Sequence, residues 1–435
     1  MHADQRSKMV VLGLDGLPFS LARTLSDQSI TPHLAGLTNQ SSCRPIRAEI
    51  PELSPVNWTS FYTGTNPGVH GVFGFTEIDP RTYRLGMVDF AAVRTPTVFD
   101  RLKDNGKSSR VINLPNTYPA RDIGGWLISG FTALEFARAV HPPYLLGPLQ
   151  AAGYRLEADT LRGRQDHDLL LAELDSVLGG RQKALDLFWP DLNWDLFVFV
   201  LTETDRLFHF LYPAVTDSNH PLHGSCLAFL RRWDALIGDV LERYRALPEP
   251  KRLMVLADHG FTELKTEVDL NVWLRREGYL ATRGRPEDEW DATVIAPGTR
   301  AFALDPGRIY LHDRNRFSRG LVAAQDAERL REKIREQLLA LTWNGEPVME
   351  AVYRREELYS GPCLGQAPDL VCLARPGMDL KAKFDRTELF GWFGRSGTHT
   401  ADDVFFYDSQ GSRLDRIRET GQEILRFFDP ASPSD

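Results

Sequence analysis

Three acidic residues each follow an apolar run that is typical of a buried strand. Asp15 ends the run "KMVVLGLD", Asp205 ends "WDLFVFVLTETD", and Asp258 stands with His259 directly after "RLMVLA". In open parallel sheets the functional crevice lies at the carboxyl ends of the strands. Aspartate and histidine are also the ligands that hold zinc and similar divalent ions. The sequence therefore predicts that these side chains converge on a metal site.

Two further histidines extend this candidate set. Asp205 and His209 lie four residues apart, about one helical turn, so both can point at one ion. His399 lies in the polar stretch "SGTHTADD", which predicts a loop. Each feature taken alone also fits an ordinary structural role, such as a turn residue or a solvated helix face. Their joint occurrence at three strand ends favours a site.

A hydroxyl opens the segment "SPVNWTSFYTGTNPGVHG" at residues 54–71. The pattern predicts a loop and then a helix, with Ser54 as the N-cap and Gly64 near the end. The amino end of a helix also favours a phosphate. A hydroxyl must be activated by a base or a metal to act as a nucleophile, and no GxSxG motif surrounds Ser54. Two interpretations stay open, a helix cap and a metal-activated nucleophile.

The elements that must position these residues alternate between strands and helices. This alternation is typical of an α/β fold with a central, mostly parallel sheet flanked by helices. A break is possible at the pair Gly179 and Gly180 inside one long helical pattern. The predicted strands cover 8–16, 108–114, 194–205 and 252–260; the predicted helices cover 32–40, 54–64, 96–106, 166–189, 222–247 and 326–342.

The pattern loosens after residue 260, where charged loops alternate with short strands. We expect a catalytic core over 8–260 and 395–428 and a smaller cap or insertion over 261–394. Residues 115–190 are expected to contribute to the cap. The tails 1–7 and 429–435 are predicted to be disordered.

Composition excludes several classes of protein. The chain has 435 residues, a formal net charge of −8 and no basic run, so no nucleic-acid surface is indicated. The sequence shows no signal peptide and no apolar run long enough to span a membrane, so a cytoplasmic protein is expected. The cysteines are widely spaced and are expected to be buried free thiols; they are Cys43, Cys226, Cys363 and Cys372.

Five segments together resemble the alkaline phosphatase superfamily, in particular its type I phosphodiesterase/nucleotide pyrophosphatase branch. They are "LGLDG", "SPVNWTSFYTGTNPGVHG", "TETDRLFH", "LADHGF" and "GTH", and they span residues 12–399 in the family order. The second segment looks most like bacterial proteins described as predicted phosphohydrolases or phosphomutases. The resemblance implies a three-layer α/β/α fold with a smaller cap.

The resemblance also implies two divalent metal ions, with zinc expected and manganese or iron compatible. Ser54 would attack phosphorus and form a covalent phospho-enzyme, which water then hydrolyses. Asn57 matches a position where nucleotide pyrophosphatases often place a phosphate-binding asparagine. One ion would be held by Asp205, His209 and His399; the other would be held by Asp15, Asp258 and His259, with Ser54 touching it.

The sequence leaves the substrate open among small phosphate esters and phosphonates. The branch commonly has threonine where this chain has Ser54, and the hydroxyl is retained. A phosphodiesterase is favoured, and a phosphonate (C–P) hydrolase shares the same frame. A phosphomutase would add basic residues, for which Lys381, Lys383 and Arg395 are candidates. A sulfatase is disfavoured because proline and arginine are misplaced after Ser54. A binding module with an inactive site would lack a ligand, whereas every expected position is filled.

Overall fold

The computed structural model describes residues 6–429, which form two compact units. The first unit takes in the described residues 6–65, 89–262 and 399–429, and the second takes in 66–88 and 263–398. Residues 66–88 therefore join the later segment, although the sequence places them in the core. Residues 115–190, which the sequence assigns in part to the cap, belong to the first unit. The predicted disordered tails fall mainly on 1–5 and 430–435, which lie outside the described residues.

An eight-stranded sheet forms the centre of the first unit, in the order β2-β21-β9-β1-β8-β5-β6-β7. The five strands from β9 to β6 run parallel, and antiparallel neighbours close both edges. This bears out the predicted mostly parallel sheet. The strands are β1 (Lys8–Leu14), β2 (Cys43–Ile46), β5 (Ser109–Leu114), β6 (Trp126–Ser129), β7 (Val140–His141), β8 (Leu196–Leu201), β9 (Lys251–Leu256) and β21 (Val404–Asp408).

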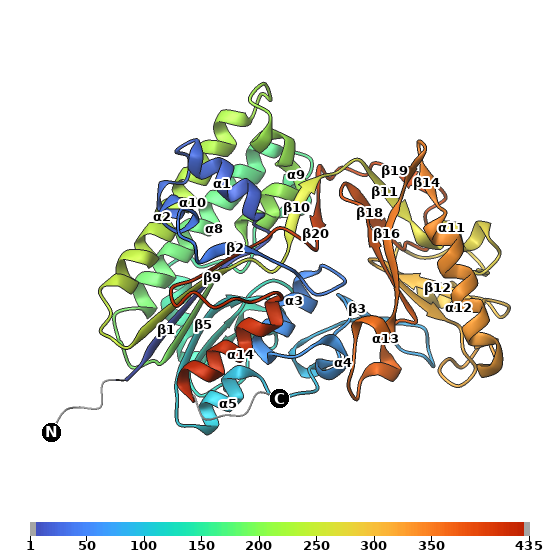
Figure 1. Cartoon of the computed structure of the whole chain (residues 1–435), viewed down its shortest axis with the longest axis horizontal. Helices are drawn as coiled ribbons and strands as arrows, with labels where there is room; N and C mark the ends of the chain where they lie inside the picture. The colour runs from blue at the N-terminus through green and yellow to red at the C-terminus, as the bar shows by residue number, and fades with distance from the viewer. Residues whose placement is uncertain (1–5, 430–435) are drawn as a thin grey trace. The chain divides into compact units, whose positions relative to one another are not determined.

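Helices cover both faces of this sheet and make the three layers (Figure 1). One face carries α3 (Ser54–Thr63), α5 (Val98–Asp104) and α14 (Ile417–Phe428), which pack on one another. The other carries α1 (Phe19–Asp27), α2 (Pro32–Thr38), α8 (His167–Phe188), α9 (Glu203–Thr216) and α10 (His223–Arg245). Because both faces are covered, β1 and β8 are buried along their whole length, and apart from Lys8 at the start of β1 their residues are apolar. Two short helices complete the unit, α6 (Leu146–Ala151) and α7 (Thr160–Gly163).

Three local predictions are wrong. Ser54 is the first residue of α3 and not its cap, because the N-cap is Leu53 and no side chain caps the helix. Gly64 does end α3, in the left-handed conformation that glycine favours, with φ 68°. The helix α8 runs without a break through Gly179 and Gly180. His399 lies on a strand, β20 (Gly397–Thr400), which pairs with β10 (Gly260–Glu263) instead of forming a loop.

The second unit has its own apolar core and mainly antiparallel sheets. A four-stranded sheet has the order β12-β13-β17-β16, and a three-stranded sheet has the order β18-β11-β19. Their strands are β12 (Ala301–Leu304), β13 (Arg308–Leu311), β16 (Met349–Arg354), β17 (Leu370–Ala374), β11 (Thr266–Asp269), β18 (Met378–Lys381) and β19 (Phe390–Gly391). Two hairpins pair β3 (Thr76–Ile78) with β4 (Leu85–Met87) and β14 (Thr342–Trp343) with β15 (Glu346–Pro347).

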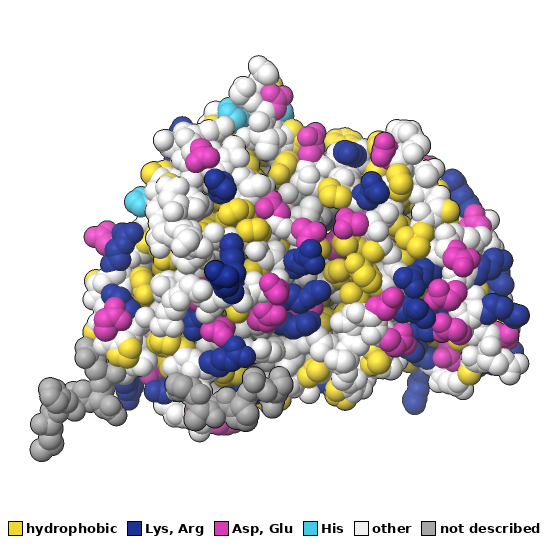
Figure 2. All heavy atoms as spheres, in the orientation of Figure 1, with side chains coloured by type: hydrophobic (Ala, Val, Ile, Leu, Met, Phe, Trp, Pro, Cys, Tyr) yellow, Lys and Arg dark blue, Asp and Glu magenta, His cyan; other side chains and the backbone are white. Residues whose placement is uncertain are grey.

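Four helices complete the second unit, of which α12 (Ala324–Leu339) packs on β16. Figure 2 shows basic and acidic side chains intermingled over α12 and α13. Arg331, for example, pairs with Glu328 and Glu356. Such a surface is solvated and internally paired. The other helices are α4 (Pro67–His70), α11 (Leu270–Arg276) and α13 (Arg355–Leu358).

Two expectations that concern the whole chain can be compared with the structure. All four cysteines are buried and free, as predicted. Within residues 6–429, none of the helices combines the length and the apolar character needed to cross a membrane.

Candidate metal centre

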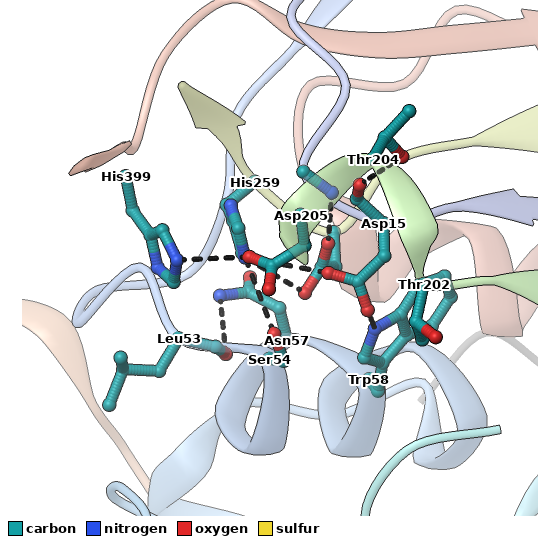
Figure 3. Close-up of polar contacts among 12 residues, drawn as sticks. Asp15, Leu53, Ser54, Asn57, Trp58, Thr202, Thr204, Asp205, His259 and His399 are labelled. Atoms are coloured by element: carbon teal, nitrogen blue, oxygen red, sulfur yellow. Dashed lines mark hydrogen bonds and ion pairs between the residues drawn. The ribbon is translucent and has the colours of Figure 1, made fainter. Parts of the chain in front are cut away.

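The order of the strands explains why distant aspartates meet. Strands β9, β1 and β8 are neighbours and parallel, so their carboxyl ends share one edge of the sheet. Asp15 directly follows β1, Asp258 follows β9 by two residues, and Asp205 lies in the first turn of α9, which β8 leads into. Figure 3 shows the side chains of Asp15, Asp205, His259 and His399 turned toward one another beside the start of α3.

One group of candidate ligands consists of Asp205, His209 and His399. Asp205 Oδ1 lies 3.4 Å from His209 Nε2 and 3.2 Å from His399 Nε2, and the two nitrogens are 3.1 Å apart. Ligand atoms at about 2.0–2.1 Å from a tetrahedral zinc ion would lie roughly 3.3 Å from one another. The three atoms therefore have the spacing that one such ion requires.

The second group consists of Asp15, Asp258 and His259, with Ser54 beside it. His259 Nε2 lies 3.8 Å from Asp15 Oδ1 and 3.4 Å from Asp258 Oδ2. The Ser54 hydroxyl donates to the same nitrogen at 3.3 Å. Each group offers three ligand atoms within 4.8 Å of one another. The groups are close together, because His259 Nε2 is also 3.8 Å from Asp205 Oδ1.

Each of the three carboxylates has one oxygen engaged and one without a hydrogen-bond partner. Trp58 Nε1 donates to Asp15 Oδ2 at 3.0 Å, and the Gly16 amide donates to Asp258 Oδ1 at 3.1 Å. Arg206 contacts Asp205 Oδ2. The remaining oxygens, Asp15 Oδ1, Asp205 Oδ1 and Asp258 Oδ2, are buried and unsatisfied. Unsatisfied buried carboxylate oxygens are costly, and bound cations would remove that cost. The residues present thus fit divalent cations.

Backbone carbonyl oxygens fix the ring orientation of two of the histidines. His259 Nδ1 donates to the carbonyl oxygen of Gly260 at 3.0 Å, and His399 Nδ1 donates to that of Glu52 at 2.8 Å. Because Nδ1 carries the proton, the lone pair of Nε2 faces the centre in each ring. The two rings stack with centroids 3.6 Å apart and planes inclined by 19°. Phe261 packs against His399 and His209.

Burial and neighbouring charges shift the pKa values of the three carboxyl groups in different directions. Burial, followed by the charge of Asp258, raises the pKa of Asp15 well above its usual range. Burial and the charge of Asp205 raise the pKa of Asp258 to about 6. Burial also acts on Asp205, but the positive charges of His209 and Arg206 outweigh it and lower the pKa of Asp205. Crowded, buried carboxylates of this kind are stabilised by added positive charge.

The structure brings seven of the eight predicted site residues to this edge of the sheet, and it places Asn57 differently. The Asn57 side chain is fully buried. Its Oδ1 accepts from the Glu49 amide at 2.6 Å, and its Nδ2 donates to the Leu53 carbonyl at 3.1 Å. These contacts tie the segment before α3 to the helix. They favour a positioning role for Asn57, and its contact with a phosphate oxygen stays a prediction.

Sequence reasoning did not find the residues that hold the candidate ligands. Trp58 lies one helical turn after Ser54, and that spacing was the signal that both side chains face the same way. The hydroxyl of Thr204 donates to the Asp15 carbonyl at 2.7 Å, and nothing in the local sequence indicates this contact. Arg206 follows Asp205 in the chain, where a basic neighbour of a candidate ligand could have been noted.

Comparisons with known proteins extend along nearly the whole chain. A model of the family "Type I phosphodiesterase / nucleotide pyrophosphatase" matches residues 9–402. Phosphonoacetate hydrolase from Sinorhizobium meliloti 1021, solved with phosphonoformate, is similar in structure, with a TM-score of 0.63 and 17% identity over 97% of this chain and 95% of that one. Murine ectonucleotide pyrophosphatase/phosphodiesterase 5 is also similar, with a TM-score of 0.57 and 13% identity over 98% of this chain and 97% of that one. A mutant of the alkaline phosphatase PafA has a TM-score of 0.55 and 11% identity over 98% of this chain and 97% of that one.

These structural likenesses bear out the predicted fold, with its central, mostly parallel sheet between helices. No curated protein sequence was found to match the chain.

Proposed function

Because the chain belongs to the type I phosphodiesterase/nucleotide pyrophosphatase family of the alkaline phosphatase superfamily, we propose that it is a phosphodiesterase with Ser54 as its nucleophile. The chain is an enzyme, a hydrolase of phosphoric ester bonds. Its superfamily implies divalent metal ions, and the Asp and His groups described above could bind them. We further propose zinc as the bound ion and a phosphate diester as the substrate.

The position of the Ser54 hydroxyl carries this proposal. The side chain is buried, lies at the first residue of α3, and donates to His259 within the second ligand group. It does not cap the helix, so the structural alternative for this hydroxyl loses its main support. The amino end of α3 adds a partial positive charge beside the Ser54 hydroxyl, which favours a phosphate there.

The six predicted ligands fit two cations, one in each group. When bound, two divalent cations would supply activation of the hydroxyl and stabilisation of the charge that develops in an in-line displacement. The chain's own residues hold this geometry. Trp58 and Thr204 fix Asp15 at its carboxylate and its carbonyl, and the two backbone carbonyls fix the rings of His259 and His399.

The chemistry proceeds in two steps at Ser54. In the first, the Oγ–P bond forms while the bond from phosphorus to the leaving alcohol breaks, so the phosphoryl group passes to the serine. In the second, water breaks the Oγ–P bond and restores the hydroxyl. A monoanionic diester needs less positive charge than a dianionic monoester. Lys381 and Lys383, candidates for binding a second charge, pair with carboxylates of their own unit instead. The pairing of two of the three basic candidates supports a diester over a phosphomutase substrate.

The experiment combines cation content with hydrolysis in one preparation. Elemental analysis of the full chain should find about two divalent ions, in line with the two ligand groups. Hydrolysis of bis-p-nitrophenyl phosphate should exceed that of p-nitrophenyl phosphate and should stop on chelation. A chain that binds no cation after reconstitution would overturn the metal centre.

A pair of hydroxyl variants tests the nucleophile. Ser54→Ala should lower kcat/KM for the diester by at least about 1,000-fold, because the group that forms the covalent bond is lost. Ser54→Thr should retain activity, since the hydroxyl is kept. The matched control is Thr59→Ala on the same helix, whose hydroxyl contacts Tyr62 and Asn116 instead. Near-native hydrolysis by Ser54→Ala would rule out the serine nucleophile.

Phosphonate hydrolysis is the second candidate, because a phosphonoacetate hydrolase shares this fold over nearly the whole of both chains. In that reaction water would replace carbon on phosphorus, and phosphonoacetate would yield acetate and phosphate. Phosphate release from phosphonoacetate by the same preparation, with no cleavage of the diester, would decide for this function.

A further inference from the structure

Arg206 holds one oxygen of Asp205 and is itself held by two neighbours. Its Nη1 contacts Asp205 Oδ2, and its Nε donates to Glu157 Oε2 at 3.0 Å. Its guanidinium carbon lies 4.0 Å from the centre of the Phe131 ring. Only 12% of the side chain is exposed. The guanidinium is planar, so a carboxylate at its edge and a ring at its face fix its orientation.

The other oxygen of Asp205 faces the candidate centre. Asp205 Oδ1 has no hydrogen-bond partner and lies 3.2–3.8 Å from the Nε2 atoms of His399, His209 and His259. Rotation about the Cβ–Cγ bond would exchange the two carboxylate oxygens. The contact with Arg206 opposes that rotation, because it is charge-assisted and directional. Asp205 is therefore confined to presenting one oxygen.

We propose that Arg206, oriented by Glu157, is a positioning residue for the cation of the Asp205, His209 and His399 group. It acts through Asp205, which it keeps as a ligand through a single oxygen in a fixed direction. This inference rests on the proposed two-cation centre.

The positive charge of Arg206 explains the role of Glu157. A guanidinium next to a cation site would repel the cation unless its charge were compensated. Glu157 supplies that compensation, and its other oxygen accepts from Thr202 at 3.3 Å. Glu157, Arg206 and Asp205 thus form a row of alternating charge that ends at the centre.

The other two aspartates are held without charge. Asp15 is held by the indole of Trp58 and Asp258 by a backbone amide. The charge of Arg206 also acts on Asp15 and His259, but Arg206 contacts neither. Loss of the guanidinium should therefore weaken the cation of the Asp205 group much more than the other cation. This selectivity separates a positioning role from a general loss of packing.

The test is a calorimetric titration of the full chain with Zn²⁺ after a chelator has removed its metal ions. The wild type should bind two ions. Arg206→Met should weaken one of them by about 10- to 100-fold, the usual effect of removing a residue that orients a ligand, and change the other much less. Glu157→Ala should weaken the same ion by a smaller factor. Glu157→Gln, which keeps an acceptor for Arg206 Nε but removes the compensating charge, should restore only part of that loss.

Arg110→Met is the matched control. Arg110 is also buried, pairs with Asp191 and lies 3.8 Å from the Trp126 ring centre, but it contacts none of the candidate ligands. Its loss should lower the melting temperature and leave both Zn²⁺ affinities unchanged.

Three outcomes would overturn the inference. They are unchanged affinities in Arg206→Met, an equal weakening of both ions, and the same loss in Arg110→Met. Should Arg206→Met not fold, the two Glu157 variants decide in the same way. A wild type that binds no Zn²⁺ at all would instead remove the proposed function, and the inference with it.

Discussion

Both ends of strand β9 carry buried charged residues, which are paired at the amino end and incompletely paired at the carboxyl end. At its amino end, Arg252 makes two contacts with Asp408, at 3.0 and 2.7 Å, and a third with Glu423 at 2.9 Å. At its carboxyl end, Asp258 and His259 meet other carboxylates, and Asp258 Oδ2 has no partner. Both ends are buried in the same unit.

The difference shows what distinguishes a structural cluster from a candidate site. A buried carboxylate must be neutralised by a partner or by a proton. At the amino end the chain supplies that partner itself, so the cluster is complete as folded. At the carboxyl end it supplies ligand atoms and leaves the positive charge to come from outside. Unsatisfied oxygens beside histidine lone pairs are therefore a stronger sign of a metal site than acidic residues alone.

Removal of divalent cations should have the largest effect, and only at the carboxyl end. Diester hydrolysis should stop on chelation and return when Zn²⁺ is added. The melting temperature should fall, because each ion present at 100 times its Kd adds about 2.7 kcal/mol of stability. Activity assays and calorimetry with and without chelator measure both. If the chelated protein kept its activity and melting temperature, the carboxyl end of β9 would need no external charge, and the contrast would fail.

Arg252→Met should have the next largest effect, and only at the amino end. The substitution leaves Asp408 and Glu423 buried without their cation, which should cost about 3–5 kcal/mol of unfolding free energy. The Zn²⁺ content should not change. Urea unfolding and elemental analysis measure the two quantities. Lys103→Met is the control, because Lys103 pairs with Asp122 on the surface and should cost at most about 1 kcal/mol. Loss of Zn²⁺ in Arg252→Met would show that the two ends are coupled.

The smallest effect should be the pH dependence of that cost. Burial acts to raise the pKa of Asp408, but hydrogen bonds and charge from Arg252 outweigh it and lower the pKa below 3.8. A carboxyl group with a lowered pKa stabilises the fold above its unfolded pKa, and this contribution disappears as the pH falls through the folded value. In Arg252→Met that offset is lost and burial raises the pKa of Asp408, so the cost should begin to shrink above about pH 4 and shrink further as the pH falls through the lowered wild-type value. Urea unfolding of both proteins at pH 7, 5 and 3.5 measures it. A cost that stays constant down to pH 3.5 would mean that packing, and not charge, dominates.

The candidate ligands at the carboxyl ends of β9 and its neighbours were largely predictable, because the signal for each lies in a short stretch of sequence. Each aspartate follows an apolar run that reads as a buried strand, and parallel strands place such positions on one edge. Even the pairing of Asp205 with His209 follows from helical spacing. What the sequence could not supply is that β9, β1 and β8 are neighbours, which the structure shows and which brings the three ends together.

The remaining features depend on contacts between residues that are far apart in the chain. The partner of Arg252 lies 156 residues away, so no window of sequence indicates the pair. His399 lies in a polar stretch that reads as a loop, yet pairing with β10 makes it a strand. Residues 66–88 join the second unit through tertiary packing that leaves no local signal. Ser54 has a residue type typical of a cap, but the backbone begins the helix one residue earlier than a cap would require.

The insertion of residues 263–398 before the last candidate ligand has a consequence for synthesis of the chain. The Asp15, Asp258 and His259 group has all its ligands once residue 259 has been added. The Asp205 group lacks its third ligand until His399, which comes 140 residues later (from 259 to 399). On the ribosome the two halves of the centre thus become complete at different times, and the main segment of the second unit must be translated between them.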